Sequence, residues 1–264
     1  MVNIIISGCC GRMGRELIKR VLQNPAMSLA GAVDYEKNPL IGQTVGSALN
    51  VGASDVKISS TTAGIAADVI VDFSSPAGTR ARAAECSKSK TPLIVGSTGL
   101  EAADLETLKT LSKTSAVLQS TNFSLGVNAL WVLSAQAAKL FGDAFEVEII
   151  ESHHHRKADA PSGTAKTLLE SIAAALGRDL KKDVVYGRSG ITGARPAKEI
   201  GVHALRQGGI VGEHTAIFAS ETEIFELKHR ALDRGVFADG ALAAALWMAG
   251  KPAGQYSMAD MLFG

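Results

Sequence analysis

The chain has 264 residues, of which 46% are hydrophobic and 5% aromatic, and its formal net charge at pH 7 is +1. This length allows two modest domains or one large one, and the composition is typical of an α/β protein. The balanced charge and the lack of basic runs argue against a nucleic-acid partner. The longest apolar-rich stretch, residues 236–249, contains Asp239 and is too short to cross a bilayer, so we expect no membrane span.

The cysteines and the first residues indicate a compartment. No cationic segment or cleavage site of a secretory signal precedes the first predicted strand. Three cysteines cannot form a disulfide framework, and the adjacent pair Cys9 and Cys10 lacks the spacing of a metal site. We therefore expect reduced thiols, no bound metal and a cytoplasmic location.

A glycine-rich turn follows the first apolar run. Residues 2–7 have the β-branched pattern of a buried parallel strand, Gly8, Gly11 and Gly14 follow, and residues 15–22 are amphipathic. Strand, glycine turn and helix in this order can cradle a diphosphate, because glycines admit the phosphates and the helix N-terminus supplies free amides. The spacing is GxxGxxG rather than GxGxxG, so a tight turn without a ligand explains this motif alone equally well.

The second predicted strand ends in an acid. Asp34 lies 20 residues beyond Gly14, a distance at which a carboxylate can accept hydrogen bonds from a ribose diol. The alternative is an aspartate that begins a turn. Tyr35 follows, the nearest cations are Lys37 and Arg12, and Asp34 itself would repel a 2′-phosphate. The pattern favours NADH over NADPH.

Further strands alternate with helices along the first half of the chain. Apolar runs at residues 67–73, 92–95 and 116–119 predict strands, and residues 79–88 and 101–111 predict helices. Each of these strands is followed by small polar residues. Ordinary turn chemistry explains any one of these loops, but several at one sheet edge favour a dinucleotide site. The pattern predicts a Rossmann-type doubly wound parallel sheet with a ligand crevice at its carboxyl edge.

Two polar stretches lack clear periodicity. Residues 39–60 are rich in glycine, serine and alanine, and we expect a loop with short irregular pieces. Residues 178–198 are polar and rich in glycine, and we expect a long loop.

The pattern changes after Gly126. Long helices are predicted at residues 127–141 and 165–176, and strands at residues 200–205, 210–218 and 223–229. This combination predicts a second α+β domain with an open mixed sheet, a face that often meets another subunit. The helix predicted at residues 235–249 is apolar nearly all round and must be buried, and we expect it to pack on the first domain.

These elements suggest a division of the chain. We expect a dinucleotide-binding domain at residues 1–126, joined by residues 236–264, and a substrate-binding and oligomerisation domain at residues 127–235.

The densest group of reactive side chains lies between a strand end and a helix start, at residues 151–165. His153 and Lys157 are plausible proton donors, because histidine titrates near neutrality and lysine is a mobile cation. The amides of Gly163 and Thr164 begin a helix and suit a carboxylate. An acidic substrate is therefore favoured.

Other interpretations of this stretch remain open. His153, His154 and His155 could be metal ligands, although neighbouring strand residues point to opposite faces. The histidines could also be structural, which is the favoured interpretation for His203, His214 and His229. Asp159 and Ser162 are expected to cap the helix.

Five motifs resemble one family in order along the chain. They are GCCGRMG at residues 8–14, DFSSP at 72–76, GSTG at 96–99, NFSLGVN at 122–128 and ESHHHRKADAPSGTA at 151–165. All resemble the 4-hydroxy-tetrahydrodipicolinate reductases, or dihydrodipicolinate reductases, of bacterial lysine and diaminopimelate biosynthesis. The HHxxKxDAPSGTA segment is highly specific.

The resemblance implies an activity and roles for named residues. The enzyme would use NADH or NADPH to reduce the small dicarboxylate 4-hydroxy-tetrahydrodipicolinate to tetrahydrodipicolinate with loss of water. His153 and Lys157 would be catalytic, and His154, Gly163 and Thr164 would bind the substrate. The cofactor contacts would be Gly8, Cys9, Cys10, Gly11, Arg12, Met13, Asp34, Gly96, Ser97, Thr98, Ser120, Thr121, Asn122 and Phe123. The family also implies a homotetramer built through the second domain.

The chain departs from the family pattern at two places. Tyr35 stands where some members carry a basic residue, which argues against NADPH. Cys9 and Cys10 stand where glycine or alanine is common, and a thiol at a helix N-terminus can have a lowered pKa. One hypothesis is therefore that oxidation of these thiols prevents cofactor binding.

Three alternative functions can be distinguished from this one by simple experiments. Another two-domain dehydrogenase with an acidic substrate would ignore the product of the preceding synthase. A nicotinamide-binding protein without turnover would not need His153 or Lys157. A histidine-rich metallohydrolase would contain zinc.

Overall fold

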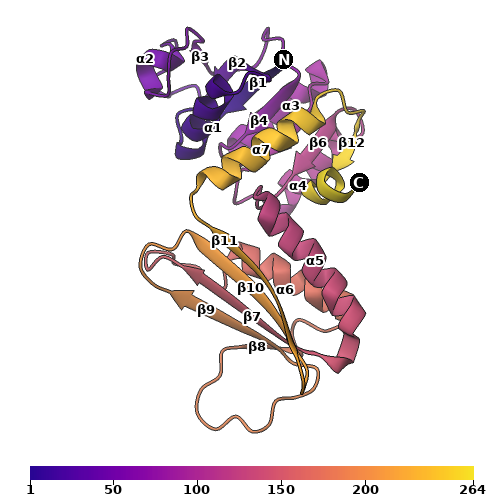
Figure 1. The fold of residues 1–264 in the computed structure, drawn as a ribbon. Coiled ribbons are helices and arrows are strands. Elements are labelled where there is room, and N and C mark those ends of the chain that lie inside the picture. The colour runs from indigo at the N-terminus through magenta and orange to yellow at the C-terminus, as the bar shows by residue number, and fades with distance from the viewer. The chain divides into compact units, whose positions relative to one another are not determined.

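The computed structural model describes residues 1–264, and the chain divides into two compact units (Figure 1). Unit 1 comprises Met1–Ser124 and Gly235–Gly264, and unit 2 comprises Leu125–Arg234. None of the helices is both long and apolar enough to span a membrane.

Unit 1 contains a parallel sheet of seven strands in the order β12-β6-β5-β4-β1-β2-β3. From β3 to β6 this is the strand order of a dinucleotide-binding fold, and the order reverses between β1 and β4. The predicted Rossmann-type sheet is therefore confirmed. Its strands are β1 (Val2–Ser7), β2 (Met27–Val33), β3 (Ile58–Ser59), β4 (Val69–Asp72), β5 (Leu93–Val95), β6 (Ala116–Gln119) and β12 (Gly254–Tyr256).

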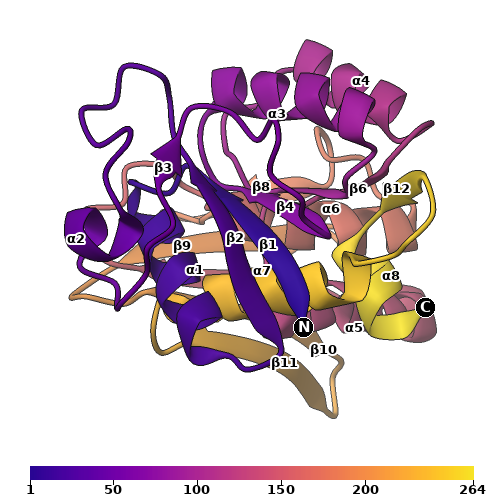
Figure 2. The ribbon, with the colours of Figure 1, turned by 90° about the horizontal axis from the view of Figure 1, so that it is seen from above.

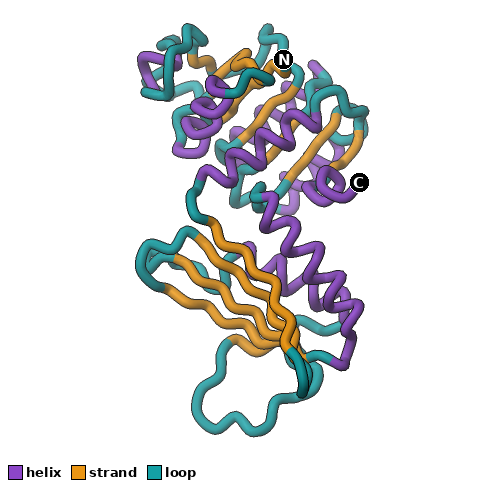
Figure 3. The backbone as a smooth tube through the Cα atoms, in the orientation of Figure 1, coloured by secondary structure: helices purple, strands orange, loops and turns teal.

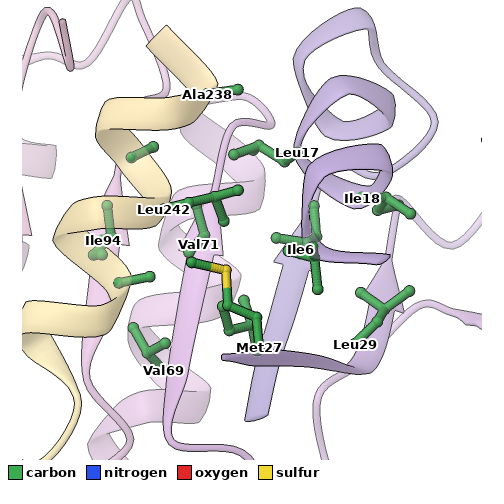
Figure 4. Packing of buried hydrophobic residues seen from close by; sticks show 14 of the residues in the cluster. Ile6, Leu17, Ile18, Met27, Leu29, Val69, Val71, Ile94, Ala238 and Leu242 are labelled. Carbon is green, nitrogen blue, oxygen red and sulfur yellow. The ribbon is translucent and has the colours of Figure 1, made fainter. Parts of the chain in front are cut away.

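Helices cover both faces of this sheet. Because side chains alternate along a strand, Ile4 and Ile6 of β1 join one apolar cluster while Ile5 joins another. Leu242 of α7 belongs to the first cluster (Figure 4), and Leu108 of α4 belongs to the second. Figure 2 shows α7 and α4 on opposite sides of the sheet. The helices are α1 (Arg12–Gln23), α2 (Val45–Leu49), α3 (Pro76–Ser89), α4 (Ala102–Leu111), α7 (Gly235–Met248) and α8 (Met258–Phe263).

Several boundaries in unit 1 differ from the prediction. Helix α3 begins at Pro76 rather than residue 79, because Ser75 accepts a 3.2 Å hydrogen bond from the Gly78 amide and proline suits the first helical position. The stretch predicted as loop at residues 39–60 contains α2 and β3, and β12 and α8 were not predicted.

Unit 2 has a mixed sheet of five strands in the order β11-β10-β7-β9-β8. Strand β10 pairs antiparallel with β7 and β11, whereas β7, β9 and β8 run parallel. Helix α6 lies between β7 and β9 in the chain, as a parallel connection requires. The strands are β7 (Glu146–His153), β8 (Val184–Tyr186), β9 (Ile200–Arg206), β10 (Gly212–Ala219) and β11 (Ile224–Ala231), and the helices are α5 (Leu125–Phe141), a short 3-10 turn (Gly142–Ala144) and α6 (Gly163–Leu176).

The two faces of this sheet differ. On β7, Val147, Ile149, Glu151 and His153 are buried on the face that α6 packs against. The two long helices of unit 2 lie on one side of its sheet (Figure 3). Glu148 lies on the opposite face, which no helix of unit 2 covers. The open mixed sheet predicted from the sequence is confirmed, although β8 interrupts the stretch predicted as loop at residues 178–198.

Candidate functional site

The glycine-rich turn of unit 1 brings β1, α1 and the loop after β4 into close contact. Gly8 has a φ of 78°, and a Cβ atom there would lie 2.5 Å from the Phe73 carbonyl oxygen. A Cβ atom on Gly14 would lie 2.2 Å from the Gly8 carbonyl oxygen. Only glycine allows this turn and the close packing of α1 on it.

Asp34 is joined directly to this turn. Its Oδ2 accepts a 2.9 Å hydrogen bond from the Cys10 amide, and its Oδ1 accepts from the Tyr35 amide and the Asn38 side chain, both at 3.0 Å. A carboxylate offers roughly four acceptor positions, so about one remains for a further donor. The acid that follows β2 can therefore still accept a hydrogen bond from a ligand hydroxyl.

A cavity of about 630 Å³ contains three of the predicted cofactor contacts, Gly8, Gly11 and Asp34. The other polar lining residues were not predicted as cofactor contacts, although Ser74 and Ser75 lie in the DFSSP motif and Tyr35 directly follows Asp34. The complete lining is Ser7, Gly8, Gly11, Asp34, Tyr35, Glu36, Ser60, Phe73, Ser74, Ser75, Ala77, Gly78, Ala81 and Arg82.

The loops after β4 and β5 are joined by a buried acid that sequence reasoning missed. Asp72 is 0% exposed and accepts hydrogen bonds from the hydroxyls of Ser74 at 2.6 Å, Thr79 at 2.6 Å and Ser97 at 2.9 Å. Ser97 also accepts a 3.0 Å hydrogen bond from the Ser74 amide. Asp72 ends β4 as Asp34 follows β2, and that shared position was the available signal.

The loop after β6 is ordered by its own contacts. Ser120 donates a 2.7 Å hydrogen bond to the Asn122 carbonyl, and the Phe123 ring lies 5.4 Å from that of Phe73. Gly240 of α7 lets that helix approach, since a Cβ atom there would lie 1.7 Å from the Phe123 carbonyl oxygen.

The remaining predicted cofactor contacts lie at the same carboxyl edge, outside the lining of the cavity. Gly96 packs on the Phe73 ring, where a Cβ atom would come within 2.3 Å. Arg12 and Met13 open α1, while Thr98 and Thr121 are exposed in the loops after β5 and β6.

The expectation of a lowered thiol pKa is wrong. Cys9 is fully buried, and burial, Cys10 and Asp34 raise the pKa of its thiol far above the usual range. Burial and Asp34 also raise the pKa of the Cys10 thiol. These effects outweigh the lowering of the thiol pKa that the helix N-terminus would cause. The two sulfur atoms and an Asp34 oxygen lie within 4.8 Å of one another, a proximity that the adjacent cysteines did not predict.

In unit 2, the predicted catalytic histidine is paired with a buried acid. Nδ1 of His153 lies 2.5 Å from Oε2 of Glu151. Two nitrogen atoms of Arg206 donate to the same carboxylate, at 2.9 and 2.8 Å. His214 packs edge-on against His153 with ring centroids 5.2 Å apart.

Lys157 and His154 lie in the turn that follows β7. The Lys157 ammonium lies 2.9 Å from an Asp159 oxygen and lowers the pKa of that carboxyl. Asp159 is therefore an ion-pair partner rather than the predicted helix cap. Nε2 of His154 lies 3.5 Å from a guanidinium nitrogen of Arg234, and desolvation together with Arg156 and Arg234 lowers its pKa.

Helix α6 supplies the predicted carboxylate-binding amides. Ser162 is its N-cap, as predicted, and accepts a 3.2 Å hydrogen bond from the Ala165 amide. Gly163 and Thr164 are the first helical residues, and Trp131 donates a 3.1 Å hydrogen bond to the Thr164 carbonyl. The first amides of a helix have no intrahelical partner and attract anions.

The histidines do not converge. Strand β7 ends at His153, so His154 and His155 lie in the following turn, and His155 contacts the Gly208 carbonyl at 2.9 Å. His203 contacts Glu148 at 2.7 Å, and His214 contacts the Ser162 hydroxyl at 3.0 Å. Each ring has a separate partner.

Four residues of this group were not identified as functional candidates from the sequence. For Glu151, which lies two positions before His153 on one strand face, the period-two spacing was an available signal. Arg206, His214 and Arg234 come from other strands or loops, and no local pattern connects them with His153.

The family models match both halves of the chain. The model described as dihydrodipicolinate reductase, N-terminus, matches residues 2–123, and the model described as dihydrodipicolinate reductase, C-terminus, matches residues 126–262.

Curated relatives and a solved structure agree with these matches. Two proteins named 4-hydroxy-tetrahydrodipicolinate reductase are similar: one from Psychrobacter arcticus is 42% identical over 99% of this chain and 95% of its own, and one from Syntrophotalea carbinolica is 40% identical over 99% of both. The structure of a dipicolinate-bound dihydrodipicolinate reductase from Paenisporosarcina sp. TG-14 is 26% identical with a TM-score of 0.77, covering 100% of both chains. The chain therefore belongs to the dihydrodipicolinate reductase family, as its motifs predicted.

Proposed function

We propose that unit 1 binds the nicotinamide dinucleotide and that unit 2 binds the substrate and exchanges the proton. The family makes the protein a nicotinamide-dependent 4-hydroxy-tetrahydrodipicolinate reductase of lysine and diaminopimelate biosynthesis. The observation that carries the assignment of unit 1 is the cavity that the glycine turn shares with Asp34.

The cradle at Gly8 and Gly14 fits a dinucleotide. Glycine at these positions allows the tight turn and the close packing of α1 on it, and the amides that open α1 suit a diphosphate. Asp34 would accept a ribose hydroxyl through its remaining acceptor position. The loops that contain Ser97 and Asn122 would hold the nicotinamide end. When bound, the dihydronicotinamide supplies a hydride.

The cavity favours NADH over NADPH. Asp34 and Glu36 both line it, and two carboxylates disfavour a 2′-phosphate. The arginine in the lining, Arg82, is already ion-paired with Glu85 at 2.8 Å and is 5% exposed. It therefore has little capacity to receive a phosphate.

Unit 2 carries the groups for a dicarboxylate and a proton. The related Paenisporosarcina structure contains dipicolinate, a flat dicarboxylate. Here the amides of Gly163 and Thr164 would receive one carboxylate, and His154 would contact it. Lys157 and His153 are the groups that can deliver a proton while the ring accepts a hydride.

The uncovered sheet face of unit 2 would meet other copies of the chain in a homotetramer. Leu205 is 46% exposed and Ile224 is 68% exposed there, on the face that the register of β7 with β9 and β10 gives them. Exposed apolar groups on an open sheet are typical of an interface. Sedimentation equilibrium should give a tetramer, and a monomer at assay concentrations would contradict this assembly.

A coupled assay tests the function. The dicarboxylate is made in situ by the preceding synthase, and oxidation of NADH and of NADPH is followed by absorbance. The account predicts oxidation that requires the synthase product and is faster with NADH at low cofactor concentration. A folded protein that oxidises neither cofactor would refute the function.

A further inference from the structure

Glu151 and His153 share one face of β7 because they are two positions apart. Glu151 is 0% exposed and His153 is 8% exposed, and their side chains meet at 2.5 Å between Oε2 and Nδ1. A buried carboxylate is retained only when charged or polar partners compensate its lost hydration.

The partners of Glu151 come from three elements. Arg206 of β9 donates to both carboxylate oxygens, at 2.9 Å to Oε2 and 2.8 Å to Oε1. The amide of Ser162 donates to Oε1 at 3.0 Å. Burial alone would raise the pKa of Glu151, but the hydrogen bonds from His153, Arg206 and Ser162 outweigh it and lower the pKa to about 2. The carboxylate is therefore ionised at neutral pH.

An ionised carboxylate can only accept, which determines the state of the imidazole. Nδ1 of His153 must carry the hydrogen that it shares with Glu151, and Nε2 is the atom left for proton exchange. The facing residue on β10 is Gly212, where a Cβ atom would lie 3.2 Å from Nε2. His214 packs against the ring, and burial together with nearby His153 lowers its pKa to about 3, so it adds no charge at neutral pH.

The same carboxylate also contacts the start of α6. Ser162, whose amide donates to Glu151, is the N-cap directly before Gly163 and Thr164. One side chain thus connects the imidazole with the helix end that suits the substrate carboxylate.

We propose that Glu151 is a positioning residue for the reductase reaction: it fixes the tautomer and orientation of His153 and ties this ring to the N-terminus of α6. This role rests on the proposed part of His153 in proton exchange. It resembles the general arrangement in which an acid orients a catalytic imidazole without touching the substrate.

The test is Glu151→Gln, which keeps the side-chain volume and removes the charge. We expect kcat to fall at least about tenfold, because general acid–base catalysis contributes roughly 10²–10⁴ to rates. The KM for NADH should not change. Without the carboxylate the imidazolium is less stable, so the limb of the kcat/KM profile that reports His153 should move to lower pH.

A double-mutant cycle separates positioning from general damage. In the His153→Asn background, Glu151→Gln should cause no further fall in kcat, because the ring that it orients is gone. If the losses in kcat of the two single variants multiply in the double variant, or if the pH profile of Glu151→Gln is unshifted, the proposal is overturned.

Glu148→Gln is the matched control. Glu148 lies on the same strand and also pairs with a histidine and an arginine, His203 at 2.7 Å and Arg188 at 2.7 Å, but on the opposite sheet face. It should leave kcat and the pH profile unchanged, and a loss equal to that of Glu151→Gln would count against the proposal.

A second variant covers the possibility that Glu151→Gln does not fold. Glu151→Asp keeps the charge for Arg206 but withdraws the oxygens from His153 by one methylene. It should fold, bind NADH normally and lose kcat, and normal turnover would overturn the proposal. If the wild-type protein does not reduce the substrate, the proposed function fails. If the wild-type protein is active and the Glu151 variants have the same kcat and pH profile, only the positioning role fails.

Discussion

The backbone amide of Cys10 donates a 2.9 Å hydrogen bond to the carboxylate of Asp34. The glycine-rich turn and the acid that follows β2 are therefore one connected structure. This bond holds the carboxylate beside the cavity in a defined orientation, so a donor from a ligand can bind without first ordering the side chain.

Asp34→Ala should weaken NADH binding more than NADPH binding. A hydrogen bond to a charged group contributes about 1.5–3 kcal/mol, so the Kd for NADH should rise by at least about tenfold. NADPH should lose less, because removal of the negative charge also removes repulsion of the 2′-phosphate. The control is Asp68→Ala, since Asp68 accepts a 2.7 Å hydrogen bond from the Asn3 amide at the start of β1. Fluorescence titration measures both cofactors, and equal losses for the two would contradict a ribose contact.

Gly14→Ala should destabilise unit 1 and weaken cofactor binding. Helix propensity alone predicts that this change inside α1 raises the free energy of unfolding by about 1 kcal/mol. The new Cβ would instead lie 2.2 Å from the Gly8 carbonyl oxygen, and overpacking of this kind costs about 1–3 kcal/mol. Urea unfolding measures the difference. Gly209→Ala, where the added Cβ has no atom within 4 Å apart from its chain neighbours, should be nearly neutral. A stabilised Gly14→Ala would refute the close packing.

Lys157→Ala should lower kcat by roughly 10²-fold or more without changing the Kd for NADH. The lysine is ion-paired with Asp159 in the turn after β7 and can deliver a proton or compensate charge on the ring. Lys166→Ala removes an exposed lysine from the first turn of α6 and should leave kcat unchanged. Steady-state kinetics with both variants decides the matter, and a normal turnover number for Lys157→Ala would remove this residue from the mechanism.

Two buried groups should make the stability of the protein sensitive to acid, over ranges that begin at different pH values. Burial and His153 lower the pKa of His214 from 6.5 to about 3, so stability should fall as the pH drops below 6.5. For Glu151, hydrogen bonds outweigh burial and lower the pKa from 4.5 to about 2, so its contribution should be lost as the pH drops from 4.5 toward 2. The full loss is on the order of 5 kcal/mol for His214 and on the order of 3 kcal/mol for Glu151.

Urea unfolding across pH measures both ranges. His214→Gln should flatten the dependence from pH 6.5 down to about 3, and Glu151→Gln from pH 4.5 down to about 2, so only the His214 variant changes the slope above pH 4.5. Identical slopes in wild type and both variants would show that these groups do not titrate as described.

Much of unit 1 was predictable because its strands are covered on both faces. Such strands appear as short continuous apolar runs, as in β1 and β4, and each of these two ends in a polar residue at the carboxyl edge, Ser7 or Asp72. The short elements were not predictable. The three residues of β12 form a strand only because Gly254 and its neighbours pair with β6, which is far away in sequence.

The candidate sites also contain residues that local patterns predict and residues that only the tertiary structure brings together. The motifs identified the turn, Asp34, His153 and Lys157, since these residues lie in local patterns. Arg206 reaches Glu151 through the register between β7 and β9, and no local pattern predicts that register. The Cys9 thiol shows a further limit, because its pKa depends on burial and on Asp34 more than on its position before a helix.

Transfer of isotope from the cofactor tests the central claim most directly. NADH carrying two deuterium atoms at C4 of the dihydronicotinamide is supplied with the dicarboxylate made in situ, and the product is analysed by mass spectrometry. The account predicts one deuterium in each molecule of tetrahydrodipicolinate, with oxidation of an equal amount of cofactor. Product formed without deuterium, or no oxidation of the cofactor by the folded protein, would contradict it.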